Sequence, residues 1–266
     1  MNILIIGKPS NNLIALIKCS KYADKIYTAS NVDKTDFPNI EYKNFDELIN
    51  KAEALKIDIA ININKTNISM GIAEIFAKSK INLISVNKKW LNLETSRQSA
   101  KQLLNYYKIN NPKIIQVPLS FPICMITDSP NKDYKITAMA ELVKKMEEHE
   151  GQKFYFEEFV DGITTELFII WDKKNIKYFC KEECMTEVQL DRLDLLKTKL
   201  NFMFSDEKAD FIGIFGIKLI WWKNDWYVIS FDMGAEIPAD CLKGTDFLYV
   251  LNAAIYQKLG ERQIKT

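Results

Sequence analysis

Short apolar runs alternate with helix-like segments over the first 86 residues of the chain, and this alternation constrains the fold more than any other feature. The runs expected to be strands are residues 2–6, 26–29, 57–63 and 82–86. The segments with helical spacing of apolar residues are 11–18, 45–55 and 69–79. Strands that alternate with helices predict a parallel, doubly wound sheet.

The rhythm changes near residue 113, where strands begin to follow one another with single helices between them. Further strands are expected at residues 114–117, 123–127, 154–159, 166–171, 177–180, 211–222 and 226–231. Further helices are expected at residues 95–107, 136–150, 186–201 and 246–259. The predicted class is α/β: a doubly wound N-terminal domain over residues 1–110, followed by an α+β domain over residues 111–266.

Glycine is scarce, with nine glycines and seven prolines in 266 residues. Loops that cradle a phosphate need glycine, because backbone amides close around the anion only where no Cβ intervenes. The only close pair, Gly213 and Gly216, lies inside an apolar run that is expected to be a strand. The sequence therefore excludes the familiar nucleotide-binding loops.

The charges nearly cancel, with 36 basic and 35 acidic side chains giving a net charge of +1. Such a chain has no bulk field that attracts nucleic acid or an anionic membrane, so neither is an expected partner. Five cysteines, an odd number, fit reduced thiols in a cytoplasm. The opening residues 1–7 lack the charged start of a signal peptide, which also favours a cytoplasmic location.

Four blocks of the sequence carry a resemblance to a known family. They are residues 57–77 with Gly71-Ile72-Ala73, residues 88–101 with Leu93-Glu94-Thr95-Ser96, residues 156–162 with Glu157-Glu158-Phe159-Val160, and residues 211–232 with Ser230-Phe231-Asp232. In this order they resemble the glycinamide ribonucleotide synthetase family, also called phosphoribosylamine–glycine ligase, an ATP-grasp enzyme of purine synthesis. The resemblance spans roughly residues 1 to 240 and implies a truncated, divergent member with an ATP-grasp-like second domain.

The resemblance implies a nucleotide cleft. Glu157, Glu158, Phe159 and Val160 correspond to an adenine hinge, in which backbone groups bind the base and Glu157 binds its amino group. Lys101 corresponds to a phosphate-contacting lysine, and Glu166 lies two residues beyond the position of a ribose-binding acid. Asp232 matches one member of a pair that holds Mg²⁺, so ATP and Mg²⁺ are the implied cofactors. Each of these features also has a simpler explanation. Glu157 and Glu158 also fit an acidic pair at an exposed strand edge, and Lys101 also fits a solvated lysine on a helix.

Several chemistry-bearing positions of the family are changed. The loop after the first strand keeps only Gly7, and Lys65 replaces a glutamate. Ile126 replaces the second phosphate lysine, residues 129–132 replace a glycine-rich flap, and Ser230 replaces the other metal-binding acid. Phosphoryl transfer depends on positioning and on electrostatic stabilisation by lysine, magnesium and backbone amides. These losses predict a catalytically degenerate protein.

The sequence thus predicts a ligase-like ATP-grasp protein that keeps nucleotide or small-ligand binding in its cleft. One alternative is an active, divergent ATP-dependent carboxylate–amine ligase, with Lys132 or Lys135 as the new phosphate lysine. Another is a structural or interaction protein, a homo-oligomer included. It would use the aromatic hairpin around Trp222 and Trp226, although these aromatic residues also fit ordinary cross-strand packing.

Overall fold

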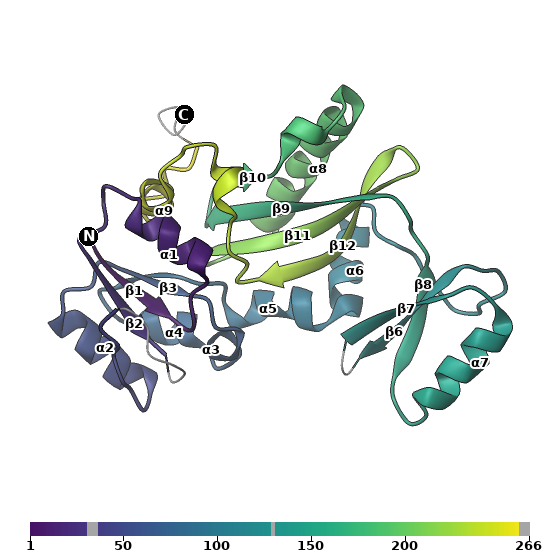
Figure 1. Ribbon diagram of the computed structural model, residues 1–266, viewed down its shortest axis with the longest axis horizontal. Helices are drawn as coiled ribbons and strands as arrows, with labels where there is room; N and C mark the ends of the chain where they lie inside the picture. The colour runs from purple at the N-terminus through teal and green to yellow at the C-terminus, as the bar shows by residue number, and fades with distance from the viewer. Residues whose placement is uncertain (31–36, 129–130, 261–266) are drawn as a thin grey trace.

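A computed structural model describes residues 1–30, 37–128 and 131–260. Its N-terminal part is a four-stranded parallel sheet in the order β2-β1-β3-β4 (Figure 1). The strands are β1 (Asn2–Ile6), β2 (Lys25–Ala29), β3 (Ile59–Asn62) and β4 (Asn82–Ile84). The α/β class and the parallel sheet expected from the alternation are therefore confirmed.

Alternate residues of β1 face opposite sides of this sheet, and helices cover both sides. Ile3 and Ile5 share a core with α1 (Asn11–Lys18) and α9 (Phe247–Ile255). Leu4 and Ile6 share another core with α2 (Phe45–Ala54) and α4 (Ile72–Phe76). A strand buried on both sides is apolar without interruption, which is why β1 is an unbroken aliphatic run.

Two helices expected as single segments are each divided in two. The segment at residues 69–79 contains the end of α3 (Lys65–Ser69) and α4, separated at Gly71, whose φ of +83° lies in the left-handed region. The segment at residues 95–107 contains the end of α5 (Lys88–Thr95) and α6 (Arg97–Tyr106). Ser96 between them has extended backbone, and its side chain caps α6 by accepting from the Ser99 N–H.

The second part of the chain contains an antiparallel sheet in the order β10-β9-β11-β12 (Figure 1). Its strands are β9 (Ile163–Asp172), β10 (Ile176–Phe179), β11 (Ile212–Trp222) and β12 (Asp225–Met233). One face of this sheet packs on α8 (Glu187–Asp206) through a core that includes Leu193, Leu200 and Phe215. The short 3-10 helices Glu182–Cys184 and Ala239–Leu242 lie in its connections.

A smaller antiparallel sheet, in the order β5-β8-β6-β7, lies with α7 (Met139–Glu148) at one end of the molecule (Figure 1). Its strands are β5 (Ile114–Ile115), β6 (Ile123–Asp128), β7 (Asn131–Ile136) and β8 (Phe154–Glu158). Strand β7 was not expected from the sequence, because this edge strand is polar and lacks an apolar run. The expected helix at 136–150 begins only at Met139.

The parallel sheet and the larger antiparallel sheet are joined directly. Ser85, just after β4, donates its N–H to the carbonyl of Ile212 in β11 at 2.7 Å. A side chain at Gly213 would come within 3.0 Å of the Val86 nitrogen, so the approach of the two segments requires glycine there. Phe168 and Ile170 of β9 also share a core with Ile3 of β1. Within the described ranges, no helix is both long and apolar enough to cross a membrane.

The connection from β8 to β9 depends on Gly162. A Cβ atom at this position would lie 2.0 Å from the carbonyl oxygen of Trp221 in β11. That contact is with backbone, so no side-chain rotation can relieve it. Glycine at the end of the Glu157–Gly162 segment is therefore a packing requirement.

We expect Gly162→Ala to lower the free energy of unfolding by about 3 kcal/mol, the upper range for overpacking a close contact. Urea denaturation measures the change. Gly151→Ala is the control, because Gly151 has open space around it and a φ of +80°. The control should cost only about 1–2 kcal/mol of left-handed strain. A loss at Gly162 no larger than at Gly151 would contradict this account.

Candidate functional site

Lys101 lies in α6 and is buried, with only 4% of the residue exposed. Its Nζ is 3.2 Å from Glu157 Oε1 and 3.4 Å from Asn111 Oδ1, and it also donates to the carbonyl of Pro112. Two of its three N–H donors thus have hydrogen-bond acceptors, and the contact with Glu157 is an ion pair. Burial lowers the pKa of Lys101, and the Glu157 carboxylate opposes that effect.

Glu157, on β8, is fully buried and is shared between two cations. Arg97, at the first turn of α6, places Nη2 at 3.0 Å from Glu157 Oε2 and Nη1 at 2.8 Å from Asp133 Oδ1 on β7. We call Arg97, Lys101, Asp133 and Glu157 the Glu157 cluster. Burial opposes the charge of Arg97, but Glu157 and Asp133 outweigh it and raise the Arg97 pKa. The cluster attaches α6 to the small sheet.

The predicted hinge consists of Glu157 and the three residues that follow it. Glu158 Oε1 lies 3.3 Å from Lys223 Nζ at the tip of the β11–β12 hairpin. Phe159 and Val160 follow the end of β8 and precede β9, outside both strands. Lys135 Nζ lies 4.3 Å from the centroid of the Phe159 ring. The predicted adenine-hinge role of these residues stays a prediction.

The position where the family has a second phosphate lysine is held here by an apolar residue that is buried in the small sheet. Ile126 on β6 is fully buried. In the register of the sheet it lies between Asp133 of β7 and Tyr155 of β8. Lys132 and Lys135, the proposed replacements, are exposed on β7. Residues 129 and 130 of the expected flap lie outside the described residues.

Glu166 and Asp232 approach each other on one face of the larger sheet. Glu166 is on β9 and Asp232 on β12, with Gly216 of β11 between their strands. A Cβ atom at Gly216 would be 3.0 Å from Glu166 Oε1 and 3.7 Å from Asp232 Cβ. Burial and the Asp232 charge raise the pKa of Glu166. The absence of a side chain at 216 thus lets two like charges share this space.

Asp232 pairs with a lysine from the parallel half of the molecule. Lys65 Nζ, at the start of α3, lies 2.7 Å from Asp232 Oδ1 and 2.7 Å from Glu94 Oε1 at the end of α5. The other Glu94 oxygen accepts the Met233 N–H at 2.7 Å. Lys65, Glu94 and Asp232 are called the Lys65 cluster. Burial lowers the Lys65 pKa, but the hydrogen bonds to Asp232 and Glu94 prevail and raise it.

Two further acids that follow Asp232 in the chain have partners of their own. Glu236 accepts the Ser10 N–H at 3.2 Å, and Asp240 pairs with Lys181. Over residues 1–30, 37–128 and 131–260, no group of three or more His, Cys, Asp or Glu side chains is arranged to hold a metal. Mg²⁺ requires oxygen ligands in near-octahedral geometry at about 2.0–2.1 Å. Because Asp232 is paired with the Lys65 ammonium, the residues around Asp232 do not fit Mg²⁺. The metal-binding role of Asp232 stays a prediction.

The aromatic residues of the β11–β12 hairpin pack across the strands. Trp221 and Trp226 form an edge-to-face pair with ring centroids 5.2 Å apart, and Trp222 pairs with Tyr227 at 5.1 Å. Trp226 is buried and donates its indole N–H to the Gln189 carbonyl at 2.9 Å. Cross-strand packing, the simpler of the two explanations for these aromatic residues, accounts for their positions.

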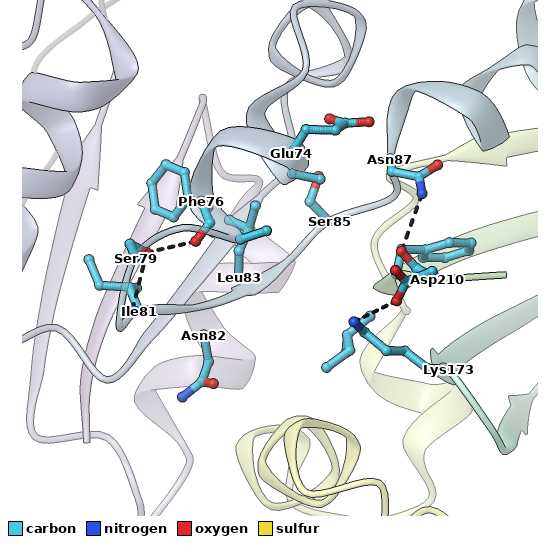
Figure 2. A pocket seen from close by; sticks show the side chains of 14 residues that line it. Glu74, Phe76, Ser79, Ile81, Asn82, Leu83, Ser85, Asn87, Lys173 and Asp210 are labelled. Atoms are coloured by element: carbon cyan, nitrogen blue, oxygen red, sulfur yellow. Dashed lines mark hydrogen bonds and ion pairs between the residues drawn. The ribbon is translucent and has the colours of Figure 1, made fainter.

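Two pockets lie away from the predicted site residues. One, of about 560 Å³, is lined by Gly7 after β1, Ser30 after β2 and Asn64 after β3. Open parallel sheets take ligands at these carboxyl ends. The other, of about 390 Å³, lies between β4 and the start of β11 (Figure 2). Its Lys173 Nζ pairs with Asp210 Oδ1 at 2.7 Å, so its opposite charges neutralise each other.

Comparisons with known proteins agree with this architecture. No family model matches the chain. The curated phosphoribosylamine–glycine ligase of Clostridium acetobutylicum is 22% identical, over all of this chain and 77% of the relative. The crystal structure of phosphoribosylamine–glycine ligase from Thermotoga maritima has a TM-score of 0.70 at 15% identity, covering 98% of this chain and 76% of that chain. D-alanine–D-alanine ligase from Bacillus anthracis, solved with ATP, has a TM-score of 0.61 at 15% identity, covering 100% and 99%.

The fold and the arrangement of the sheets are those of the solved phosphoribosylamine–glycine ligase and D-alanine–D-alanine ligase. In sequence the chain is similar to phosphoribosylamine–glycine ligases, which confirms the resemblance seen in the sequence. The low identity marks it as a divergent relative.

Three residues of the two clusters have roles that were not expected from the sequence. Arg97 gives no signal, because it is one of 36 basic residues in the chain. Lys65 lies in a segment expected to be a loop, and Glu94 just before an expected helix, both far from Asp232 in sequence. The resemblance supplied one signal for Lys65, since it implies an acid at that position.

We expect Glu157→Gln to lower the free energy of unfolding by about 3–5 kcal/mol, because it leaves the buried Lys101 ammonium without its anion and removes one of the two carboxylates paired with Arg97. Denaturant titration measures the loss. Glu158→Gln is the matched control, since Glu158 follows Glu157 in the chain and its carboxylate is partly exposed and pairs with the exposed Lys223. The control should change stability by less than about 1 kcal/mol. Equal losses in the two variants would show that burial of the cluster is unimportant.

Glu166 should make stability depend on pH in a predictable direction. Its raised pKa means that the folded state holds the proton more tightly than the unfolded state. Stability therefore falls as the pH rises through the window between the ordinary value, about 4.3, and the raised one. Glu166→Gln removes this cost and should be more stable than wild type at pH 7, by less than about 1 kcal/mol because the group is partly exposed.

Thermal melts between pH 3 and 8 measure the difference between Glu166→Gln and wild type. The difference should vanish below about pH 4, where the wild-type carboxyl is protonated in both states. Glu147→Gln, at an exposed position of α7, is the control. Lower stability of Glu166→Gln than of wild type at pH 7 would contradict the account.

Proposed function

We propose that this protein binds an adenine nucleotide between its two antiparallel sheets without catalysing the ligase reaction. The observation that carries the proposal is the buried ammonium of Lys101, which donates to Asn111 and Pro112 and forms an ion pair with the buried Glu157 carboxylate. A phosphate could bind Lys101 only by displacing the buried carboxylate of Glu157. The cation expected to hold a nucleotide phosphate is therefore committed to the protein.

The rest of the polyphosphate side has the same character. Ile126, buried and apolar, offers no charge where a second phosphate lysine was expected. Asp232 is bound to Lys65 rather than free for Mg²⁺. Transfer of a phosphoryl group requires such charges to be in place as negative charge develops. Without them the rate enhancement falls by several orders of magnitude, since a single stabilising donor is worth about 10²–10³ in kcat.

The base and sugar side supports binding. Phe159 and Val160 carry backbone groups outside the strands, positioned to pair with the edge of a base, as the hinge resemblance implies. Within the described residues, Arg97 Nε is buried and has no hydrogen-bond partner. A buried donor left unpaired costs about 1–3 kcal/mol, which a ligand oxygen or a water would recover. The D-alanine–D-alanine ligase structure, which was solved as a complex with ATP, supports the choice of this ligand class.

A divergent, active ATP-dependent carboxylate–amine ligase is the second candidate. Lys218 on β11 favours it, because this exposed lysine lies beside Glu166 and Ser230 in the register of the sheet. It adds a cation to the face that carries Asp232. That lysine could bind an anionic group without displacing any part of the Glu157 cluster.

Thermal-shift titrations with AMP, ADP and ATP, each with Mg²⁺ and with EDTA, test the proposal. Each nucleotide at a hundredfold excess over its Kd should stabilise the fold by about 2.7 kcal/mol. The three affinities should agree within about tenfold, because Lys101 is held by Glu157 and the buried Ile126 offers no charge to an extra phosphate. Mg²⁺ should change none of them. Val160→Pro, which removes the hinge N–H, should lose the shift, and Val160→Ala should keep it.

The outcomes separate the candidates. Stabilisation by ATP that requires Mg²⁺ and greatly exceeds that by AMP would contradict the proposal and favour the ligase. No stabilisation by any nucleotide at millimolar concentration would contradict both and favour the interaction protein.

A further inference from the structure

We propose that the Lys65 ammonium is the resident cation of the β12 site and occupies the position that a divalent metal would need between Glu94 and Asp232. The inference deepens the proposed function, because it concerns the metal side of the same site. Its test uses no nucleotide, so the two proposals can fail separately.

Three elements bring the ammonium to this position. Asn64 caps α3 by accepting the Thr66 N–H at 2.9 Å, which fixes the first helical residue, Lys65. Glu94 ends α5 and accepts the Met233 N–H, so its carboxylate is held against the strand that carries Asp232. The ammonium then lies 2.7 Å from one oxygen of each carboxylate. Both distances are those of charge-assisted hydrogen bonds.

The charges around the ammonium explain why a cation is needed. Glu94 and Asp232 are in direct contact with the Lys65 ammonium, and the Glu166 carboxylate lies above Gly216, on the same face of the sheet as Asp232. Among the described residues, the Asp232 oxygen that meets Lys65 is buried and has no hydrogen bond besides this ion pair. Three carboxylates in one region repel one another unless positive charge lies among them. Lys65 supplies that charge covalently.

The same arrangement excludes a divalent ion. Both carboxylates point one oxygen at the ammonium, and a second cation in that space would be repelled by it. Ser230, exposed on the same face as Asp232, brings a hydroxyl instead of an acid. An ammonium at 65 and a hydroxyl at 230 are therefore matched changes: one adds positive charge and the other removes a metal ligand.

Removal of the ammonium should uncover a metal site. Lys65→Ala leaves Glu94 and Asp232 without their shared cation, and Mg²⁺ or Mn²⁺ can be held by one or two carboxylates with water as the other ligands. Mn²⁺ alone, with no nucleotide, is the probe, and electron paramagnetic resonance of free Mn²⁺ measures its binding. We expect Lys65→Ala to bind Mn²⁺ at least tenfold more tightly than wild type. Lys65→Arg should resemble wild type, because it keeps the positive charge.

Lys51→Ala is the matched control. Lys51 is 46% exposed against 45% for Lys65, and its Nζ lies 2.8 Å from Glu47 on α2. This variant removes an equivalent ion pair away from the site and should not gain Mn²⁺ binding. The double variant Lys65→Ala with Asp232→Asn should lose what Lys65→Ala gained. If Lys65→Ala fails to fold, Lys65→Met keeps the aliphatic stem and removes only the charge.

Equal Mn²⁺ affinity in wild type and in a folded Lys65 variant without the ammonium would overturn the inference. Gained binding that survives Asp232→Asn would also overturn it, because the metal would then lie elsewhere. If wild type binds Mn²⁺ and Asp232→Asn abolishes this binding, the metal displaces the Lys65 ammonium. That result would also overturn the inference.

Discussion

The buried carboxylate of Glu157 is the constraint on which the rest of the site depends. A carboxylate with no exposed surface is stable only if it is paired, and Lys101 and Arg97 provide the pairing. This pairing fixes α6 against the small sheet and commits both cations to the fold. Chemistry that would need either cation for a ligand must first break the cluster, at a cost comparable with a large part of the stability of a typical domain.

The two clusters satisfy their charges in opposite ways. In the Glu157 cluster, the lysine expected to hold a phosphate is paired with a carboxylate of the protein. In the Lys65 cluster, the carboxylate expected to hold a metal is paired with a lysine of the protein. Each change replaces a partner from solution with one built into the chain. The scaffold that positions these residues is retained over the whole length shared with phosphoribosylamine–glycine ligases. The chain thus combines the fold of these solved ligases with two clusters in which charged side chains of the protein pair with one another.

The parallel sheet could be predicted from the sequence because strands buried on both faces must be apolar, as Ile3–Ile6 are. The polar edge strand β7 and the break at Ser96 could not, since an edge strand needs no apolar run and a cap can interrupt a periodic pattern without changing it. Lys101 was found as a site residue by resemblance, but its partners Asn111 and Pro112 come from the connection after α6. Contacts of this kind depend on the tertiary fold, and so does the meeting of Lys65 with Asp232.

The central claim is that Lys101, the cation expected to hold a phosphate, stays paired with Glu157 and takes no part in phosphoryl transfer. Its sharpest test is γ-phosphate release from radiolabelled ATP under single-turnover conditions with Mg²⁺, in the presence of phosphoribosylamine and glycine. We predict release from wild type no faster than from Lys101→Met. Release that requires Mg²⁺ and is lost in Lys101→Met would contradict the claim, because it would show that Lys101 leaves Glu157 to act on phosphate.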